Sequence, residues 1–292
     1  MPKRSLSCVL GAAALLATLT ACGSTPRSAA QAPPARTTAP ASGAPATTAA
    51  AAPAGDQAAA PAAAWAKWGL KPLPAAPAAP ADKPVKLPAT GPVPVFSEVP
   101  TTDKVVFITI DDGAEKDPKF VEMATDLKVP FSMFLTRDIV RSDYGYFKPL
   151  QALGNRIHNH STGHPAMSGL TADRQKAEVC DAQSALTEQY GTAPLLFRPP
   201  YGDGAHSPGL NSAVRQCGPR AVVLWRESMQ IHDMQYQSAD KKLRPGDIIL
   251  AHFRGPKDLK GETMTKMFGE LLARIQEQGF SVGRLEDYIA AG

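Results

Sequence analysis

Short apolar runs alternate with longer amphipathic stretches along the C-terminal two thirds of the chain. The apolar runs predict strands at residues 105–110, 131–135, 156–159, 195–197, 221–225, 248–251 and 280–282. The amphipathic stretches predict helices at residues 118–127, 147–153, 172–190, 210–217 and 264–278. Strands that alternate with helices form a parallel sheet, because each helix carries the chain back across a face of the sheet. We therefore expect an α/β fold, either a (β/α) barrel of seven or eight units or a doubly wound sheet.

The N-terminus has the features of an export signal. Lys3 and Arg4 precede an apolar run at residues 8–19, which is too short to span a bilayer comfortably. The run ends in Leu-Thr-Ala-Cys, which resembles a bacterial lipobox that would make Cys22 the acylated N-terminus. Plain secretion and an uncleaved anchor are the alternatives, but Leu19 fits a simple secretory cleavage site poorly. We expect residues 1–21 to be a lipoprotein signal peptide and the protein to lie, lipid-anchored, on the extracellular face of the cell membrane.

Residues 22–95 are rich in Ala and Pro and lack the apolar patterning of a core. We expect this stretch to be a disordered tether and residues 96–292 to be one folded domain. Trp65 and Trp68 stand out within the tether. They indicate either a docking patch for the cell wall or a partner, or a small segment that packs back onto the folded domain.

Charge and cysteine content narrow the partners and the compartment. The chain has a net charge of +4, but residues 96–292 hold 23 basic and 25 acidic residues, which disfavours a nucleic-acid-binding domain. Once Cys22 is acylated, the exported protein retains two cysteines, Cys180 and Cys217. Because the compartment is oxidising, we expect a disulfide between them.

Polar residues follow several of the predicted strands, at the sheet edge where α/β folds place their sites. Asp111 and Asp112 end the first strand, and two adjacent carboxylates repel unless a cation lies nearby. His160 and His164 follow the third strand, four residues apart, a spacing that lets two imidazoles reach one ion. Taken singly, the carboxylates also fit an ordinary turn and the histidines a structural role.

Two further groups end later strands. Arg198 and Tyr201 lie in Phe-Arg-Pro-Pro-Tyr-Gly, where the prolines predict a rigid loop from which Arg198 and the Tyr201 backbone N–H project. His252 ends the apolar run at residues 248–251. Each also has an ordinary structural reading, but four polar groups at one edge of a parallel sheet are unlikely to arise by coincidence.

Residues 104–288 resemble the polysaccharide deacetylases, that is, the NodB homology domain of carbohydrate esterase family 4. The resemblance rests on four motifs in a fixed order, Asp-Asp, His-x-x-x-His, Arg-x-Pro-Tyr and Leu-x-His. The resemblance implies a distorted (β/α) barrel, a divalent metal and hydrolysis of N-acetyl or O-acetyl groups on glycans. Zinc is the metal we expect, with cobalt or nickel as alternatives. We expect a monomer whose substrate is an acetylated glycan, with peptidoglycan favoured over chitin oligomers and acetylxylan.

The resemblance also assigns roles to individual residues. Those that would bind the metal are Asp112, His160 and His164. Those that would act in the reaction are Asp111 as general base, His252 as general acid, Arg198 as the residue that orients Asp111, and Tyr201 through its backbone N–H at the oxyanion.

The chain departs from the family after the fifth strand, where the motif Asp-x-x-Asp-Trp is not legible. Glu227 or Asp233 would then supply the acid that supports His252 or Arg198. Two other functions fit the same residues, namely a catalytically silent glycan-binding lipoprotein and an amidase or esterase for a small non-sugar substrate.

Overall fold

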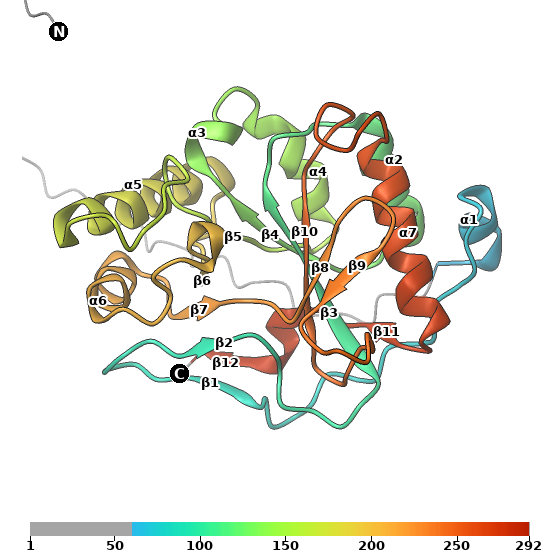
Figure 1. The fold of residues 1–292 in the computed structure, drawn as a ribbon, viewed down its shortest axis with the longest axis horizontal. Coiled ribbons are helices and arrows are strands. Elements are labelled where there is room, and N and C mark those ends of the chain that lie inside the picture. The colour runs from blue at the N-terminus through green and yellow to red at the C-terminus, as the bar shows by residue number, and fades with distance from the viewer. Residues whose placement is uncertain (1–59, 292) are drawn as a thin grey trace, which may run out of the picture. The chain divides into compact units, whose positions relative to one another are not determined.

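The structure, a computed structural model, describes residues 60–291 (Figure 1). Cys22 and the predicted signal peptide lie outside the described residues. One main sheet has the strand order β2-β7-β6-β5-β4-β3-β10-β8-β9, and β11 pairs with β3 beside this path. Its strands are β2 (Val95–Phe96), β3 (Val105–Asp112), β4 (Ser132–Leu135), β5 (Ile157–Asn159), β6 (Leu196–Phe197), β7 (Ala221–Val223), β8 (Glu227–Met229), β9 (Met234–Tyr236), β10 (Ile248–His252) and β11 (Ser281–Val282). All pairs are parallel except β8 with β9.

Helices cover the sheet between the strands. They are α1 (Ala62–Lys67), α2 (Pro118–Leu127), α3 (Arg137–Val140), α4 (Phe147–Ala152), α5 (Ala172–Tyr190), α6 (Pro208–Cys217) and α7 (Met264–Glu277). Short 3-10 turns are η1 (Tyr144–Tyr146), η2 (Pro200–Gly202) and η3 (Leu285–Tyr288). Within residues 60–291, none of the helices has the length and apolar character needed to cross a membrane.

The main sheet curls because one segment of the chain forms hydrogen bonds at both ends of the strand order. At one end the Leu224 amide donates to the Phe96 carbonyl beside β7, and two residues later the Arg226 amide donates to the Ile248 carbonyl beside β10. Residues 221–229 therefore leave one side of the sheet and join the other. The result is the distorted, incomplete (β/α) barrel that the sequence predicts.

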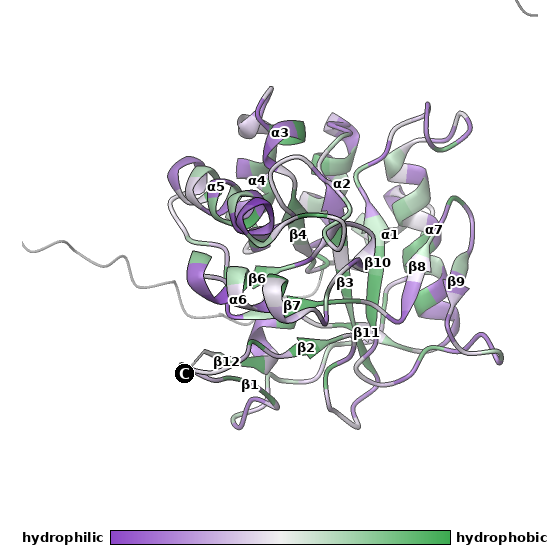
Figure 2. Cartoon of the chain, turned by 60° about the vertical axis from the view of Figure 1, so that its left-hand side comes forward, coloured by the Kyte–Doolittle hydropathy of each residue, from purple (hydrophilic) through white to green (hydrophobic). Residues whose placement is uncertain are grey.

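The strands separate two apolar cores. Along β3 the side chains of Val106, Ile108 and Ile110 pack toward the helices, whereas Val105 and Phe107 pack inside the curled sheet. This alternation is what a strand buried on both faces requires. Figure 2 shows the same division in hydropathy, with apolar central strands and a polar outer surface on α5.

Local signals fix the helix ends. The Asp117 carboxylate accepts from the Lys119 amide at the start of α2, and Pro118 occupies the first helical position. At α5, Thr171 caps the N-terminus and Gly191 ends the helix with φ 69°, a conformation that costs glycine little. These ends agree with the predicted ranges for both helices.

The predicted start of the folded domain at residue 96 is wrong. Trp65 of α1 is 5% exposed and packs in the helix-side core, while Trp68 Nε1 donates to Asp126 at 2.9 Å. Lys67 Nζ lies 2.7 Å from Glu122 and 2.6 Å from Asp126. The two tryptophans thus form a segment that packs back onto the domain, not a docking patch for a partner.

A second, two-stranded sheet holds more of the predicted tether. It pairs β1 (Val85–Leu87) with β12 (Ile289–Ala291) in parallel. Val85, Leu87 and Val93 are buried. A few apolar side chains are enough to hold this segment in place, because the folded domain supplies the surface against which they are buried. The Ala/Pro-rich composition of the segment does not reveal that surface.

The predicted disulfide is present. Cys180 on α5 is bonded to Cys217 at the end of α6, across 37 positions of sequence. The bond ties together two helices that also pack against each other, with Cys217 beside the apolar cluster beneath them.

A buried acidic pair lies near the start of β8 and β10. Glu227 and Asp247 are hydrogen-bonded, and both are almost completely buried. Burial, followed by the charge of Asp247, raises the pKa of Glu227 to about 8. Arg226, Arg244 and Glu98 are the nearest charged neighbours. At neutral pH the pair therefore shares one proton.

Replacing both cysteines by serine should lower the free energy of unfolding by about 3–4 kcal/mol, because the denatured chain loses the closure of a long loop. Denaturant unfolding of wild type and of the Cys180→Ser/Cys217→Ser variant measures the difference. Mass spectrometry of unreduced peptides should show the two residues linked, and two free thiols in protein exported by its own cell would contradict the assignment.

The acidic pair makes stability depend on pH. The folded protein keeps the Glu227 proton up to about pH 8, whereas the unfolded chain releases it near the ordinary value of 4.5. Stability contributed by the protonated pair is therefore lost as pH rises between these values. We expect the melting temperature of Glu227→Gln at pH 8 to exceed that of wild type by at least about 2–4 °C, the shift that 1 kcal/mol produces in such a domain. Glu188→Gln, an exposed control on α5, should keep the wild-type pH profile; parallel profiles for wild type and Glu227→Gln would contradict the shared proton.

Candidate functional site

The ends of β3, β5, β6 and β10 bring the predicted site residues together. Asp111 and Asp112 close β3, and His252 at the end of β10 pairs in register with Asp111. His160 follows β5, and Arg198 follows β6. Because these strands are parallel and adjacent, with β4 between β3 and β5, all four ends meet at one edge of the sheet.

Asp112, His160 and His164 form a cluster whose ligand atoms all lie within 4.8 Å of one another. Asp112 Oδ1 is 3.5 Å from His160 Nε2 and 3.2 Å from His164 Nε2. This oxygen is buried without a hydrogen-bond partner of good geometry. Asp112 (φ 73°) and His164 (φ 60°) adopt the left-handed region, which is costly for residues with a Cβ. The strained backbone directs the side chains toward a common centre.

The surroundings prepare these side chains to hold a cation. His160 Nδ1 donates to the Arg198 carbonyl at 2.7 Å, which leaves the lone pair of Nε2 facing the cluster. Burial alone would raise the pKa of Asp112, but the nearby imidazoles of His160 and His164 outweigh burial and hold the pKa well below its usual range. One carboxylate and two imidazoles suit a divalent transition metal and leave positions open. The donor set therefore fits the metal that the sequence implies.

Asp111 lies beside the cluster but has a different partner. Its Oδ1 is 2.7 Å from Arg198 Nη1, and its Oδ2 is 3.5 Å from His160 Nε2. Arg198 has no exposed surface. The prediction that this arginine projects from the proline loop is therefore wrong, because its side chain runs inward to reach Asp111. Only the backbone of the loop is held by the prolines.

Three other acceptors complete the surroundings of Arg198. Nη1 also donates to Thr109 Oγ1 at 2.9 Å, Nε donates to the Val223 carbonyl at 2.9 Å and Nη2 donates to the Leu224 carbonyl at 3.2 Å. The guanidinium carbon stands 4.3 Å from the centroid of the Phe134 ring. The charge of Arg198 is thus fully compensated in the interior.

His252 and Tyr201 flank the cluster. Burial lowers the pKa of His252 to about 4, against the opposing charges of Asp111 and Asp112, so that the imidazole is neutral at pH 7. Tyr201 is 70% exposed, has φ 61° and packs its ring edge-on to His164 at 4.9 Å. Among residues 60–290, Tyr201 is the one large hydrophobic residue that is exposed.

Neither of the acids suggested as a substitute for the missing motif occupies that place. Glu227 is buried against Asp247, and Asp233 is exposed, with Oδ1 3.5 Å from Arg274 Nε. His252 and Arg198 are instead surrounded by the residues described above. The suggestion that Glu227 or Asp233 supports them is wrong, because both side chains turn to other neighbours.

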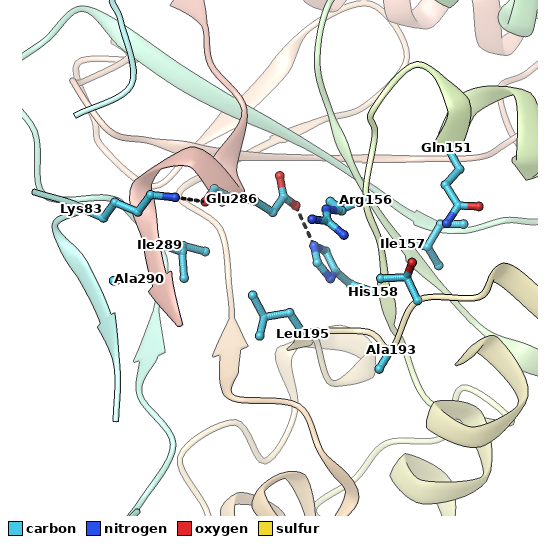
Figure 3. A pocket seen from close by; sticks show the side chains of 11 residues that line it. Lys83, Gln151, Arg156, Ile157, His158, Ala193, Leu195, Glu286, Ile289 and Ala290 are labelled. Atoms are coloured by element: carbon cyan, nitrogen blue, oxygen red, sulfur yellow. Dashed lines mark hydrogen bonds and ion pairs between the residues drawn. The ribbon is translucent and has the colours of Figure 1, made fainter. Parts of the chain in front are cut away.

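His158 lies two residues before His160 but faces a different space. Its Nε2 is 2.7 Å from Glu286 Oε1, which also accepts from the Ser132 hydroxyl. The two side chains line a cavity of about 550 Å³ together with Lys83 and Arg156 (Figure 3). None of the residues of the metal cluster lines this cavity. His158 is therefore not part of the cluster.

The sequence analysis missed two residues that hold the histidine loop. Glu178 on α5 accepts from the amides of Thr162 and Gly163 at 3.1 and 2.8 Å. Asn159 accepts from the Ser161 amide at 2.9 Å through its side chain. The placement of Asn159 next to His160 was a usable signal, whereas a glutamate inside an amphipathic helix carries none.

Comparison with known proteins gives matches for most of the folded domain. A family model described as polysaccharide deacetylase matches residues 98–222. The chain is 36% identical to an uncharacterized protein of Streptomyces coelicolor over 214 residues, which are 73% of this chain and 82% of the relative. It is 25% identical to the peptidoglycan-N-acetylglucosamine deacetylase of Bacillus cereus over 195 residues, which are 63% of this chain and 87% of that enzyme.

Solved structures show the same fold. A pseudoenzyme of the CE4 family (carbohydrate esterase family 4) from Bacillus anthracis superposes with a TM-score of 0.56 at 18% identity, over 69% of this chain and 72% of that chain. The family model covers β3 through part of β7, which includes every residue of the Asp-His-His cluster. From the curled sheet, the cluster at its edge and these matches, it follows that the chain belongs to the polysaccharide deacetylase family.

Proposed function

We propose that this protein is a metal-dependent hydrolase that removes N-acetyl or O-acetyl groups from a polysaccharide, with peptidoglycan as the favoured polymer. The observation that carries the proposal is the division between two adjacent carboxylates. Asp112 turns to two histidines, whereas Asp111 turns to a buried arginine. One carboxylate is thus available to hold a cation and the other to accept a proton.

Asp112, His160 and His164 would hold the ion, with zinc favoured and cobalt or nickel as alternatives. A bound divalent ion supplies a Lewis acid that lowers the pKa of water and polarises a carbonyl group. The chain contributes the ionised state of Asp112, the open Nε2 of His160 and the fixed positions of all three side chains.

Asp111 is suited to act as the general base. The Arg198 guanidinium at 2.7 Å holds the Oδ1 oxygen in place, and the interior position keeps bulk water away from the carboxylate. Because Arg198 occupies Oδ1, the other oxygen is the one that would take a proton from water attacking the acetyl carbon. Arg198 acts through Asp111 and is a positioning residue.

His252 and Tyr201 would serve the second half of the reaction. The imidazole is neutral at rest, so it must gain a proton before it gives one to the leaving nitrogen. The proton removed by Asp111, its register partner, is the available source. The Tyr201 backbone N–H would donate to the oxyanion. Acetate and a glucosamine unit are the products from an N-acetylglucosamine unit.

A catalytically silent glycan-binding protein is the main rival, and a CE4 pseudoenzyme shares the fold. Binding alone does not require a buried arginine that holds one carboxylate apart from the cluster. A small amide or ester is the other rival. Relatives named as peptidoglycan deacetylases of Bacillus cereus and Listeria monocytogenes favour the polymer.

We also propose that Cys22 carries a lipid and that the protein works as a monomer on the outer face of the cell membrane. The Leu-Thr-Ala-Cys sequence before an Ala/Pro-rich stretch supports this location. Several acyl chains would hold the protein stably, because a single chain binds only marginally. The cell wall would then lie within reach of the enzyme.

The assigned roles predict different defects in four variants. His160→Ala and Asp112→Ala should lose bound metal and activity together, because each removes a ligand. Asp111→Asn should keep near-normal metal content and lose about 10²- to 10⁴-fold in turnover, the range of a general base. Metal analysis and rates of acetate release from acetylated glycans measure both properties; a fully active Asp111→Asn would contradict its role.

His252→Ala should retain its metal, and the size of its activity loss should depend on the leaving group of the substrate. The loss of activity should be greater on an N-acetyl glycan than on an aryl acetate, whose phenolate leaves without a proton. Rates on both substrates for wild type and variant decide this point. An equal loss on both would contradict the acid role while leaving the deacetylase assignment intact.

Cys22→Ala should move the protein from the membrane fraction to the medium and leave the activity of the folded domain unchanged. Fractionation of the producing cells, followed by mass spectrometry of the N-terminal peptide, tests the anchor. Wild-type protein found wholly in the medium without lipid on Cys22 would rule it out.

A further inference from the structure

A second cavity lies where the chain departs from the family pattern. Its volume is about 540 Å³, and it opens beside the β8–β9 hairpin. The residues that line it are Trp225, Arg226, Ser228, Met234, Gln235, Tyr236, Gln237, Ser238, Ala239 and Lys241. Nine of these ten residues follow Trp225 within the stretch that lacks the Asp-x-x-Asp-Trp motif.

Trp225 connects this cavity to the catalytic residues. The Arg198 guanidinium carbon is 5.5 Å from the centroid of the Trp225 ring, and Arg198 holds Asp111. A β-carbon at Gly202, next to Tyr201, would stand 3.4 Å from Cη2 of the same ring. Trp225, which lines the cavity, therefore also packs beside the arginine that positions Asp111 and beside the Tyr201 turn.

The lining has the chemistry of a glycan site. Amide and hydroxyl groups on Gln235, Gln237 and Ser228 offer hydrogen bonds, and the Trp225 and Tyr236 rings offer apolar faces. Gln237 already donates to the Trp225 carbonyl at 2.9 Å, whereas Gln235 keeps its amide protons for a ligand. No acidic residue lines the cavity.

The lining of the cavity carries a positive charge that no neighbouring carboxylate in the described part of the chain balances. Arg226 is paired with Glu98 at 2.8 Å, and the nearby Asp240 is paired with Arg244 at 3.4 Å. Lys241 has no ion-pair partner among residues 60–291. It adopts φ 52° in the turn after β9, and its amide donates to the Ser238 carbonyl. The cavity thus presents one uncompensated cation among neutral donors and acceptors.

We propose that this cavity binds a glycan unit that carries a carboxylate, and that Lys241 is the residue that selects it. The inference rests on the proposed deacetylase function. Muramic acid has the required chemistry where its lactyl carboxylate is free of a stem peptide, whereas chitin and acetylxylan backbones are neutral. Lys241 would therefore favour peptidoglycan strands over neutral acetylated polymers.

The test uses two matched substrates and three variants of the full chain. The substrates are peptidoglycan glycan strands freed of stem peptides, and the same strands with their carboxylates reduced to alcohols. Lys241→Gln removes the charge, Lys241→Arg keeps it, and Lys242→Gln removes the charge of an adjacent exposed lysine outside the cavity. KM and kcat for acetate release are measured at low and high salt, together with equilibrium binding of both strands.

Wild type should show a KM about 2- to 5-fold lower for the carboxylate strands than for the reduced strands, the range of a single partly exposed ion pair. Lys241→Gln should abolish this preference without changing kcat, high salt should weaken it, and Lys241→Arg and Lys242→Gln should retain it. If wild type and Lys241→Gln release acetate with the same preference between the carboxylate and the reduced strands, the carboxylate site is overturned and the proposed deacetylase function still stands. If no glycan releases acetate, the proposed function is overturned. The cavity proposal is then decided by whether wild type binds the carboxylate strands more tightly than the reduced strands and Lys241→Gln does not.

Discussion

The buried guanidinium of Arg198 is the interaction on which both the fold and the site depend. A charge without exposed surface is tolerated only when it is paired and hydrogen-bonded, and removing one partner of such a pair typically costs about 3–5 kcal/mol. Arg198 meets this requirement with the Asp111 carboxylate, the Thr109 hydroxyl and the carbonyls of Val223 and Leu224. Those carbonyls lie where the chain passes from one end of the sheet to the other. The same side chain therefore joins the curl of the sheet to the position of the proposed base.

The backbone of Arg198 adds a second constraint. Its carbonyl accepts from His160 Nδ1 and so selects the tautomer that directs Nε2 to Asp112. The loop from β6 thus positions the proposed base with its side chain and a proposed metal ligand with its main chain. This arrangement explains why two adjacent aspartates, Asp111 and Asp112, have different surroundings although only one peptide bond separates them.

The sequence predicts the central strands and the capped helices because their signals are local. β3 is a continuous apolar run, and α5 has a threonine cap and a terminal glycine. The strands β1, β2, β8, β9 and β12 escape prediction because two or three residues show no periodicity and their pairing partners are distant in sequence. The same limit misplaces the start of the domain, since Trp65 is buried in a cluster built mainly from residues that are distant in sequence, among them those of α2 and α7.

The site is predictable where the ends of parallel strands determine position. That rule brings together the residues at the ends of β3, β5 and β10 without any knowledge of side-chain direction. It does not reveal that Arg198 turns inward, because a proline loop fixes its own backbone but not the rotamer of the residue before it. It also does not reveal Glu178, whose function is to accept two backbone amides of the histidine loop.

The pairing of β1 with β12 has a consequence for the order in which the chain can fold. Val85 pairs with Ile289, so a strand made early must wait for almost the last residues of the chain. Contacts of such long sequence separation form late, because the loop between them must first be closed by other structure. During vectorial synthesis, the segment that contains β1 therefore stays unpaired until residues 289–291 have been made. The small sheet can therefore close only after every strand of the main sheet has been made.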